Sequence, residues 1–191
     1  MAGVAGPMLQ RSRASGARFL TGLAVGGISA GLVLAVPLYL AGHLAGRVMP
    51  LPVKMVLLVG LAFALGLADL TGRTPHVWRQ VPQRLVRSLP PGALGLTWGF
   101  DLGLLVTTQK ASSLLWLSIA AVTLLDPGLV PAALIAFSLA ATAGVLTLSM
   151  TAWAVAMRGG LDWTWIRRTR WATGATMLAA GLGTLLMSVT G

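Results

Sequence analysis

Long apolar stretches alternate with short polar segments along the chain. The apolar stretches cover approximately residues 19–45, 53–70, 92–125, 130–157 and 171–189. A stretch of roughly 18 or more apolar residues predicts a helix that crosses a membrane. The regular alternation that marks the strands of a membrane barrel is missing from them. We therefore predict an all-α polytopic membrane protein with about five to six transmembrane helices, in a single domain that spans residues 1–191.

The stretch 92–125 is too long for one straight crossing. With a rise of about 1.5 Å per residue it would form a helix of about 50 Å, whereas the hydrocarbon core measures about 30 Å. The polar sequence "TTQKASS" at 107–113 interrupts it. The stretch is therefore either two short spans or one crossing that is broken or re-entrant.

Loop charges favour the single crossing. In that case the Arg-rich N-terminal segment and the connectors 71–91 and 158–170 all face one side of the membrane. The positive-inside rule makes that side cytoplasmic. We expect five crossings of a bacterial-type cytoplasmic (inner) membrane, with the N-terminus cytoplasmic and the C-terminus outside. Arg47 and Lys54 fall on the outer side and run against the rule.

The spans at 19–70 and 130–189 both pair a longer stretch with a shorter one, in opposite directions under this topology. Inverted repeats with a broken helix between them are typical of secondary transporters. Two such pairs also arise by chance in an apolar chain, so both interpretations stay open.

Composition supports the membrane class. Of the 191 residues, 56% are hydrophobic and 9% are charged, and the formal net charge is +10. So few charged residues cannot cover a soluble protein of this size. Because the basic residues cluster between apolar stretches, we expect the partners to be the lipid bilayer, with anionic lipid at 71–91 and 158–170, and no nucleic acid. The chain has no cysteine, which excludes disulfides and thiol redox relays.

Asp101 and Lys110 are charged residues inside the apolar stretch 92–125. If residues 95–109 are helical, Thr97, Asp101 and Thr108 share one face. A carboxylate that faces lipid is costly, so an acidic residue at this depth marks a binding site or a structural pair. The candidate binding site comprises Asp101, Lys110, Thr97, Thr108 and Gln109. The alternative is that Asp101 pairs with Lys110 or an arginine, or accepts hydroxyl hydrogen bonds, and only fixes helix packing.

Lys110 lies nearly opposite Asp101 on a continuous helix, so the two can pair only if the helix breaks. Irregular backbone at membrane depth is tolerated where it is buried in protein or lines a cavity. The alternative is an interfacial loop from which Lys110 extends its amine to water.

Three further patterns predict helix packing. Gly95, Gly99 and Gly103 form a ridge opposite the Thr97/Asp101 face, which lets a neighbouring helix approach closely. A second stripe, expected to point inward, comprises Ser138, Thr142 and Ser149. Asp69 and Arg73, four residues apart at the end of a span, predict an interfacial ion pair.

The sequence gives little support for a metal site or for catalysis. His43 and His76 lack the spacing of metal ligands, so we expect no metal and no cofactor. No nucleophile lies beside a base in a recognisable pattern, and we expect no enzymatic activity.

Two segments carry a family resemblance. "LGLTWGFDLGLLVTTQKASSLLWLSIAAV" at 94–122 resembles the broken fourth helix of the cytochrome-c-biogenesis and thiol-disulfide interchange membrane proteins. "FLTGLAVGGISAGLVLAVPLYLAG" at 19–42 resembles their glycine-rich first helix. The resemblance implies a scaffold of inverted three-helix repeats. The electron transfer of that family depends on Pro-Cys motifs that this chain lacks; Gly99 to Asp101 stand where a cysteine would be expected.

Two functions of different kinds fit these observations. The first is a small transporter-like membrane protein that moves an ion or small solute through the polar site at the broken helix. The second is a non-catalytic membrane subunit, or a maturation or assembly factor, that works with protein partner subunits in a larger membrane complex.

Overall fold

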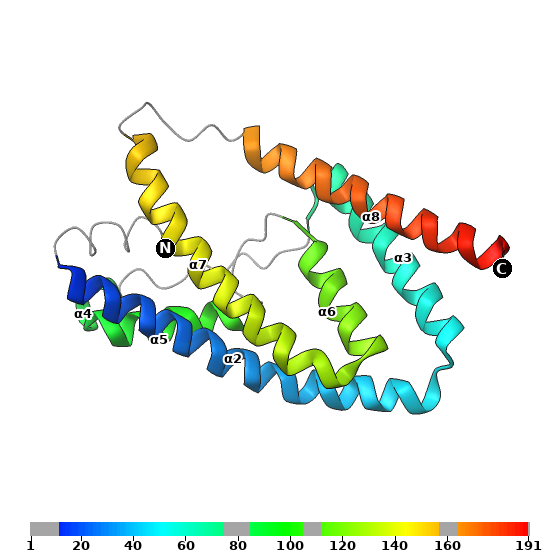
Figure 1. Cartoon of the computed structure of the whole chain (residues 1–191), viewed down its shortest axis with the longest axis horizontal. Helices are drawn as coiled ribbons and strands as arrows, with labels where there is room; N and C mark the ends of the chain where they lie inside the picture. Colours follow the sequence, from blue (N-terminus) through cyan, green and yellow to red (C-terminus); the bar gives the residue numbers. More distant parts are fainter. Residues whose placement is uncertain (1–11, 75–84, 105–111, 157–163, 191) are drawn as a thin grey trace. The chain divides into compact units, whose positions relative to one another are not determined.

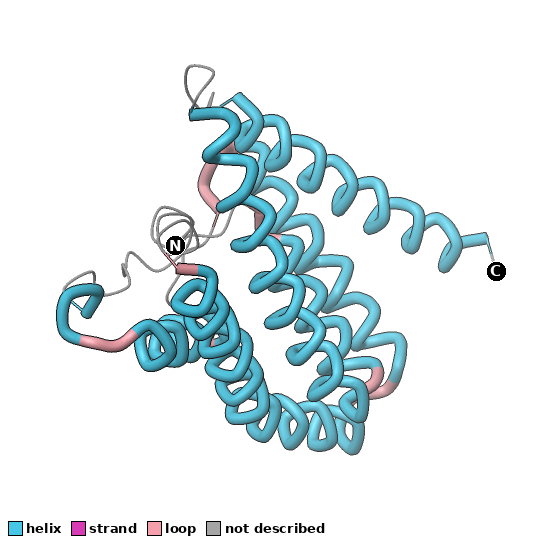
Figure 2. Tube along the Cα trace, turned by 60° about the vertical axis from the view of Figure 1, so that its left-hand side comes forward, coloured by secondary structure: helices cyan, strands magenta, loops and turns pink. Residues whose placement is uncertain are grey.

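The computed structural model describes residues 12–74, 85–104, 112–156 and 164–190. Figure 2 shows helices joined by short loops, and the described residues contain no strand. The predicted all-α class is confirmed. Among the described residues, three segments are long and apolar enough to cross a membrane: Arg13–Val48, Leu51–Leu70 and Pro127–Thr147. These apolar helices are those of a membrane protein.

The elements follow one another in a simple order along the chain (Figure 1). They are α2 (Arg13–Val48), α3 (Leu51–Leu70), α4 (Leu85–Ser88), α5 (Pro91–Gly103), α6 (Leu114–Leu125), the 3-10 turn η1 (Pro127–Leu129), α7 (Val130–Ala156) and α8 (Thr164–Thr190).

Prolines determine where two of these helices begin. Pro50 precedes α3 and Pro90 precedes α5, each with an extended backbone (ψ 155° and 154°). A further proline lies in the first turn of each helix, where the missing N–H is not needed for the helical ladder. At the other end of α3, Gly72 adopts a φ of 73°. That left-handed conformation costs glycine little and turns the chain out of the helix.

The stretch 92–125 is divided between two helices. α5 has 13 residues and ends at Gly103, whereas α6 has 12 residues and begins at Leu114. Their lengths are about 20 Å and 18 Å, and neither is long enough for a hydrocarbon core of about 30 Å. The stretch is therefore not one straight helix, as predicted.

The chain divides into two compact units, each built from three separated stretches. Unit 1 comprises residues 1–36, 77–108 and 131–162, and unit 2 comprises residues 37–76, 109–130 and 163–191. Helix α2 contributes to both, and the division falls at Pro37. Proline removes one hydrogen bond from the ladder of a helix, yet α2 continues past this residue to Val48.

In unit 1, α5 packs directly on the backbone of α2. A Cβ atom on Gly95 would collide with the Phe19 carbonyl oxygen, and one on Gly99 with the Leu23 carbonyl oxygen. The contact is reciprocal, because a Cβ on Gly22 of α2 would collide with the carbonyl oxygen of Gly92. Small residues on facing helices permit this approach. The predicted glycine ridge is confirmed, and α2 is the helix that it contacts.

Large apolar side chains surround the glycine contact. Phe19, Leu23, Leu94 and Trp98 are buried in one cluster. The rings of Phe19 and Trp98 meet edge to face, with centroids 6.0 Å apart and an interplanar angle of 84°. This geometry is favoured by aromatic pairs. The cluster therefore holds α5 in a fixed position along α2.

Helix α7 joins unit 1 through a buried serine. The Ser138 hydroxyl donates to the Gly27 carbonyl oxygen on α2 at 2.9 Å. Thr142, one turn later, is half-buried and donates to the Ser138 carbonyl oxygen of its own helix at 2.9 Å. The predicted inward direction of this stripe is confirmed for Ser138; the Ser149 side chain lies outside the described residues.

In unit 2, α3 lies alongside α8 (Figure 1), again through glycines. A Cβ on Gly66 would lie 3.1 Å from the Gly174 carbonyl oxygen, and one on Gly174 would lie 3.0 Å from that of Gly66. The last turns of α2 reach α6 and η1, where Gly42 faces the Thr123 carbonyl oxygen and the Pro127 ring. Close helix packing through small residues is thus common to both units.

We predict that Gly99→Ala lowers the thermal stability of the detergent-purified protein. The added methyl group meets the Leu23 carbonyl oxygen, so α5 must move away from α2, at a cost of about 1–3 kcal/mol. Gly144→Ala on α7 is the matched control, because a Cβ there meets no atom within 4 Å. Unfolding midpoints that fall equally in both variants would contradict the proposed contact.

Candidate functional site

Asp101 lies two residues before the end of α5. The glycines at 95, 99 and 103 face α2, so Asp101 and Thr97 lie on the side of α5 that points away from α2. Both side chains are half-buried. The Thr97 hydroxyl donates to the Ala93 carbonyl oxygen one turn earlier at 2.9 Å. Its proton is therefore used within the helix, and Asp101 is the chemically distinctive group on this face.

The other three predicted site residues, Thr108, Gln109 and Lys110, lie outside the described residues. The structure thus places Asp101 and Thr97 on one face of α5, as predicted. The pairing of Asp101 with Lys110 stays a prediction.

A second polar site, which the sequence pattern does not predict, surrounds Asp69. This aspartate is 2% exposed, in the last turn of α3. Its Oδ1 accepts hydrogen bonds from the Ser113 hydroxyl at 2.7 Å and from the Thr74 hydroxyl at 2.8 Å. Its Oδ2 accepts the Ser113 backbone N–H at 2.7 Å. One carboxylate therefore joins three parts of unit 2: the end of α3, the segment that follows it and the residue that precedes α6.

The predicted ion pair between Asp69 and Arg73 is wrong. Residues four apart face each other only if the helix continues through both, and α3 ends at Leu70. Gly72 turns the chain away, which leaves Arg73 exposed and brings Thr74 back to the carboxylate. Asp69 is buried among neutral donors instead of pairing with the Arg73 guanidinium.

The position of Ser113 explains why a negatively charged side chain is favourable at position 69. Ser113 is the residue that precedes α6, where the backbone N–H groups of the first turn lack helical partners. A negative charge near the beginning of a helix is stabilised by the helix dipole. Asp69 therefore anchors α6 as an external capping group. In the sequence, this contact is indicated only by an acidic residue at the end of one apolar stretch and a serine before another. The two residues are 44 positions apart, so no local pattern connects them.

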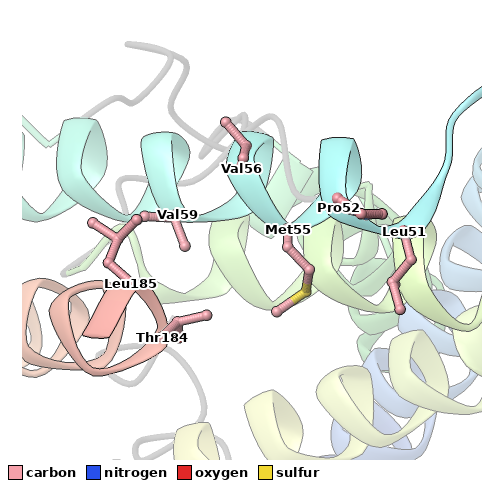
Figure 3. Close-up of a pocket in the computed structure, with 7 residues that line it drawn as sticks. All are labelled: Leu51, Pro52, Met55, Val56, Val59, Thr184 and Leu185. Carbon is pink, nitrogen blue, oxygen red and sulfur yellow. The ribbon is translucent and has the colours of Figure 1, made fainter. Parts of the chain in front are cut away.

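Unit 2 also contains a cavity of about 670 Å³ between α3 and α8 (Figure 3). Helix α3 contributes Leu51, Pro52, Met55, Val56 and Val59. Helix α8 contributes Thr184 and Leu185, and Figure 3 shows Leu185 reaching toward Val59. The Thr184 hydroxyl donates to the Ala180 carbonyl oxygen of its own helix at 2.8 Å. The cavity therefore has an apolar wall, and its single hydroxyl is already used as a donor.

Metal chemistry has no site in the described part of the chain, where no group of three or more His, Asp or Glu side chains lies together. His43 stacks at 4.2 Å on the ring of Tyr39, and its Nδ1 lies 3.2 Å from the Tyr39 carbonyl oxygen. His76 lies outside the described residues.

Comparison of the sequence with models of protein families finds no match, and neither curated proteins nor solved structures give one.

We predict that Asp69→Ala destabilises the protein more than any other single loss of an acidic side chain in unit 2. It removes the acceptor of three hydrogen bonds, and each buried donor left unsatisfied costs about 1–3 kcal/mol. Ser113→Ala should have a smaller effect, since the backbone N–H still binds Asp69. Thermal unfolding in detergent measures both.

Asp126→Ala is the matched control, because Asp126 is an exposed aspartate of the same unit. Equal unfolding midpoints for the Asp69 and Asp126 variants would show that the buried carboxylate does not anchor α6.

Proposed function

We propose that this chain is a small integral membrane protein that moves an ion or small solute through a polar site at Asp101, where the stretch 92–125 is broken. One observation carries the proposal: Asp101 lies two residues from the end of a helix of 13 residues that is too short to span the membrane. In secondary transporters, discontinuous helices of this kind line the substrate and ion sites near the middle of the bilayer.

The energetics of a membrane support the same function. A carboxylate that faces hydrocarbon is costly, and an irregular backbone at membrane depth is tolerated only in contact with protein or water. Both costs are avoided if the end of α5 lines an aqueous or ion-filled cavity. The glycine contact with α2 makes α5 a rigid wall, and Asp101 is on the side of that wall that points away from α2.

The proposed topology has five crossings, of which the broken stretch 92–125 makes the third. It places the N-terminus and the two basic connectors in the cytoplasm and the C-terminus outside, in accordance with the positive-inside rule. An inverted repeat and a scaffold like that of the thiol-disulfide interchange membrane proteins are part of the proposal. Electron transfer is not, since the chain has no cysteine.

A second candidate function is that of a membrane subunit or assembly factor without transport activity. The cavity between α3 and α8 favours it, because that cavity has an apolar wall and offers no path for an ion. In this case Asp101 fixes the packing of unit 1 or of a partner subunit.

We predict that Asp101→Asn abolishes cation- or proton-coupled currents while leaving the unfolding midpoint unchanged. The amide keeps the shape and hydrogen-bonding capacity of the side chain but removes its charge. Solid-supported-membrane electrophysiology on proteoliposomes, with jumps of pH, Na⁺ and K⁺, measures the currents. Asp126→Asn, which removes an exposed aspartate, is the control.

Three results would count against transport at Asp101. They are wild-type currents in Asp101→Asn, a collapse of stability in Asp101→Leu with currents unchanged, and copurification of a stoichiometric partner with a protein that carries no current. The last result would favour the membrane-subunit function.

We also predict the orientation of two loops from single-cysteine variants, for which the chain has no thiol background. Arg167→Cys, at the basic end of α8, should react only after the membrane is permeabilised. Gly128→Cys, in the turn before α7, should react with an impermeant maleimide in intact cells. Both residues are exposed. The opposite pattern of labelling would invert the proposed topology.

A further inference from the structure

We propose that the cavity between α3 and α8 binds an acyl chain of an anionic phospholipid, whose phosphate is held by Arg47 and Lys54 at the turn between α2 and α3. This lipid site is independent of the proposed transport function and lies wholly within unit 2.

The apolar lining of the cavity favours a hydrocarbon ligand over a polar one. Six of its seven lining residues are apolar, and the seventh, Thr184, donates its hydroxyl proton to Ala180. A polar ligand would lose its hydrogen bonds to water and gain none in return. A volume of about 670 Å³ is within the range of ligand-binding cavities, roughly 300–1,000 Å³.

The position of the cavity along α3 fits the acyl chain of a membrane lipid. Helix α3 is a candidate span of 20 residues, so its length of about 30 Å matches the thickness of the hydrocarbon core. The lining residues on α3 occupy its first half, from Leu51 to Val59. The cavity therefore extends from the membrane surface inward, along the path that an acyl chain follows.

Basic residues lie at the same end of α3. Arg47 is in the last turn of α2, and Lys54 is in the first turn of α3. The Lys54 amine lies 3.9 Å from the place that a Cβ of Gly46 would occupy, so it points toward the end of α2 that carries Arg47. Two positive charges at the surface end of an apolar cavity complement an anionic headgroup with its acyl chain.

The proposal also accounts for two residues that the positive-inside rule leaves unexplained. Arg47 and Lys54 are on the outer side in the proposed topology, where basic residues are disfavoured. A bound lipid phosphate supplies the negative charge that makes them favourable there.

Native mass spectrometry of the full-length protein, purified in mild detergent and exposed to equal amounts of phosphatidylglycerol and phosphatidylcholine, tests the proposal. We expect one phosphatidylglycerol per chain to resist detergent washing. Each basic side chain near the headgroup should contribute about fivefold to the preference over phosphatidylcholine. The double variant Arg47→Gln/Lys54→Gln should lose most of that preference. Arg13→Gln/Arg18→Gln, which removes two exposed charges of α2 in unit 1, should retain it.

Val59→Trp places an indole at the inner end of the cavity, across the proposed path of the acyl chain, and should abolish the retention of both lipids. Leu57→Trp is its matched control: Leu57 is 48% exposed and does not line the cavity. Retention of lipid by Val59→Trp would overturn the proposal, as would an unchanged lipid preference in the Arg47/Lys54 variant. A wild-type dimer without bound lipid would overturn it in favour of a second copy of the chain. Because the Arg47/Lys54 variant changes only surface charge, the test stands even if Val59→Trp fails to fold.

Discussion

Direct contact between helix backbones is the interaction on which unit 1 depends. In a membrane, lipid tails are as apolar as leucine, so helices gain little by burying leucines against each other. They gain more where small residues let two backbones approach and the surrounding side chains interlock. Glycines on α2 and α5 provide that approach, and the Phe19–Trp98 cluster fills the space beside it. The orientation of α5, and with it the placement of Asp101, follows from this contact.

Unit 2 depends on a second constraint, the satisfaction of polar groups away from water. Asp69 could have been a leucine if only packing mattered. As a carboxylate it accepts hydrogen bonds from two hydroxyls and one backbone N–H, and it thereby joins the end of α3 to Thr74 and to the residue before α6. Buried charges are costly unless they are fully hydrogen-bonded, and here both carboxylate oxygens have short partners. The hydrogen bonds to these oxygens fix the position of Ser113, and with it the beginning of α6.

Local features of the chain could be predicted from the sequence, and features that depend on tertiary contacts could not. The helical class, the division of 92–125 and the ridge of Gly95, Gly99 and Gly103 follow from spacing within one segment. The Asp69 site requires knowledge that α3 ends at Leu70 and that Ser113 lies beside it. The spacing of four residues predicts an ion pair between Asp69 and Arg73, but only in a helix that continues through both residues. Asp101 and Thr97 share a face as predicted, because that relation is also local.

The hydrogen bonds of Asp69 also have a consequence for how the protein is made. Ser113 follows Asp69 by 44 residues. At a synthesis rate of about 5–20 residues per second, the serine leaves the ribosome about 2–9 s after the aspartate. During that interval the carboxylate lacks two of its three donors and must remain hydrated, with only Thr74 close behind it in the chain. The end of α3 therefore reaches its final hydrogen bonding only when the segment that begins α6 has been synthesised.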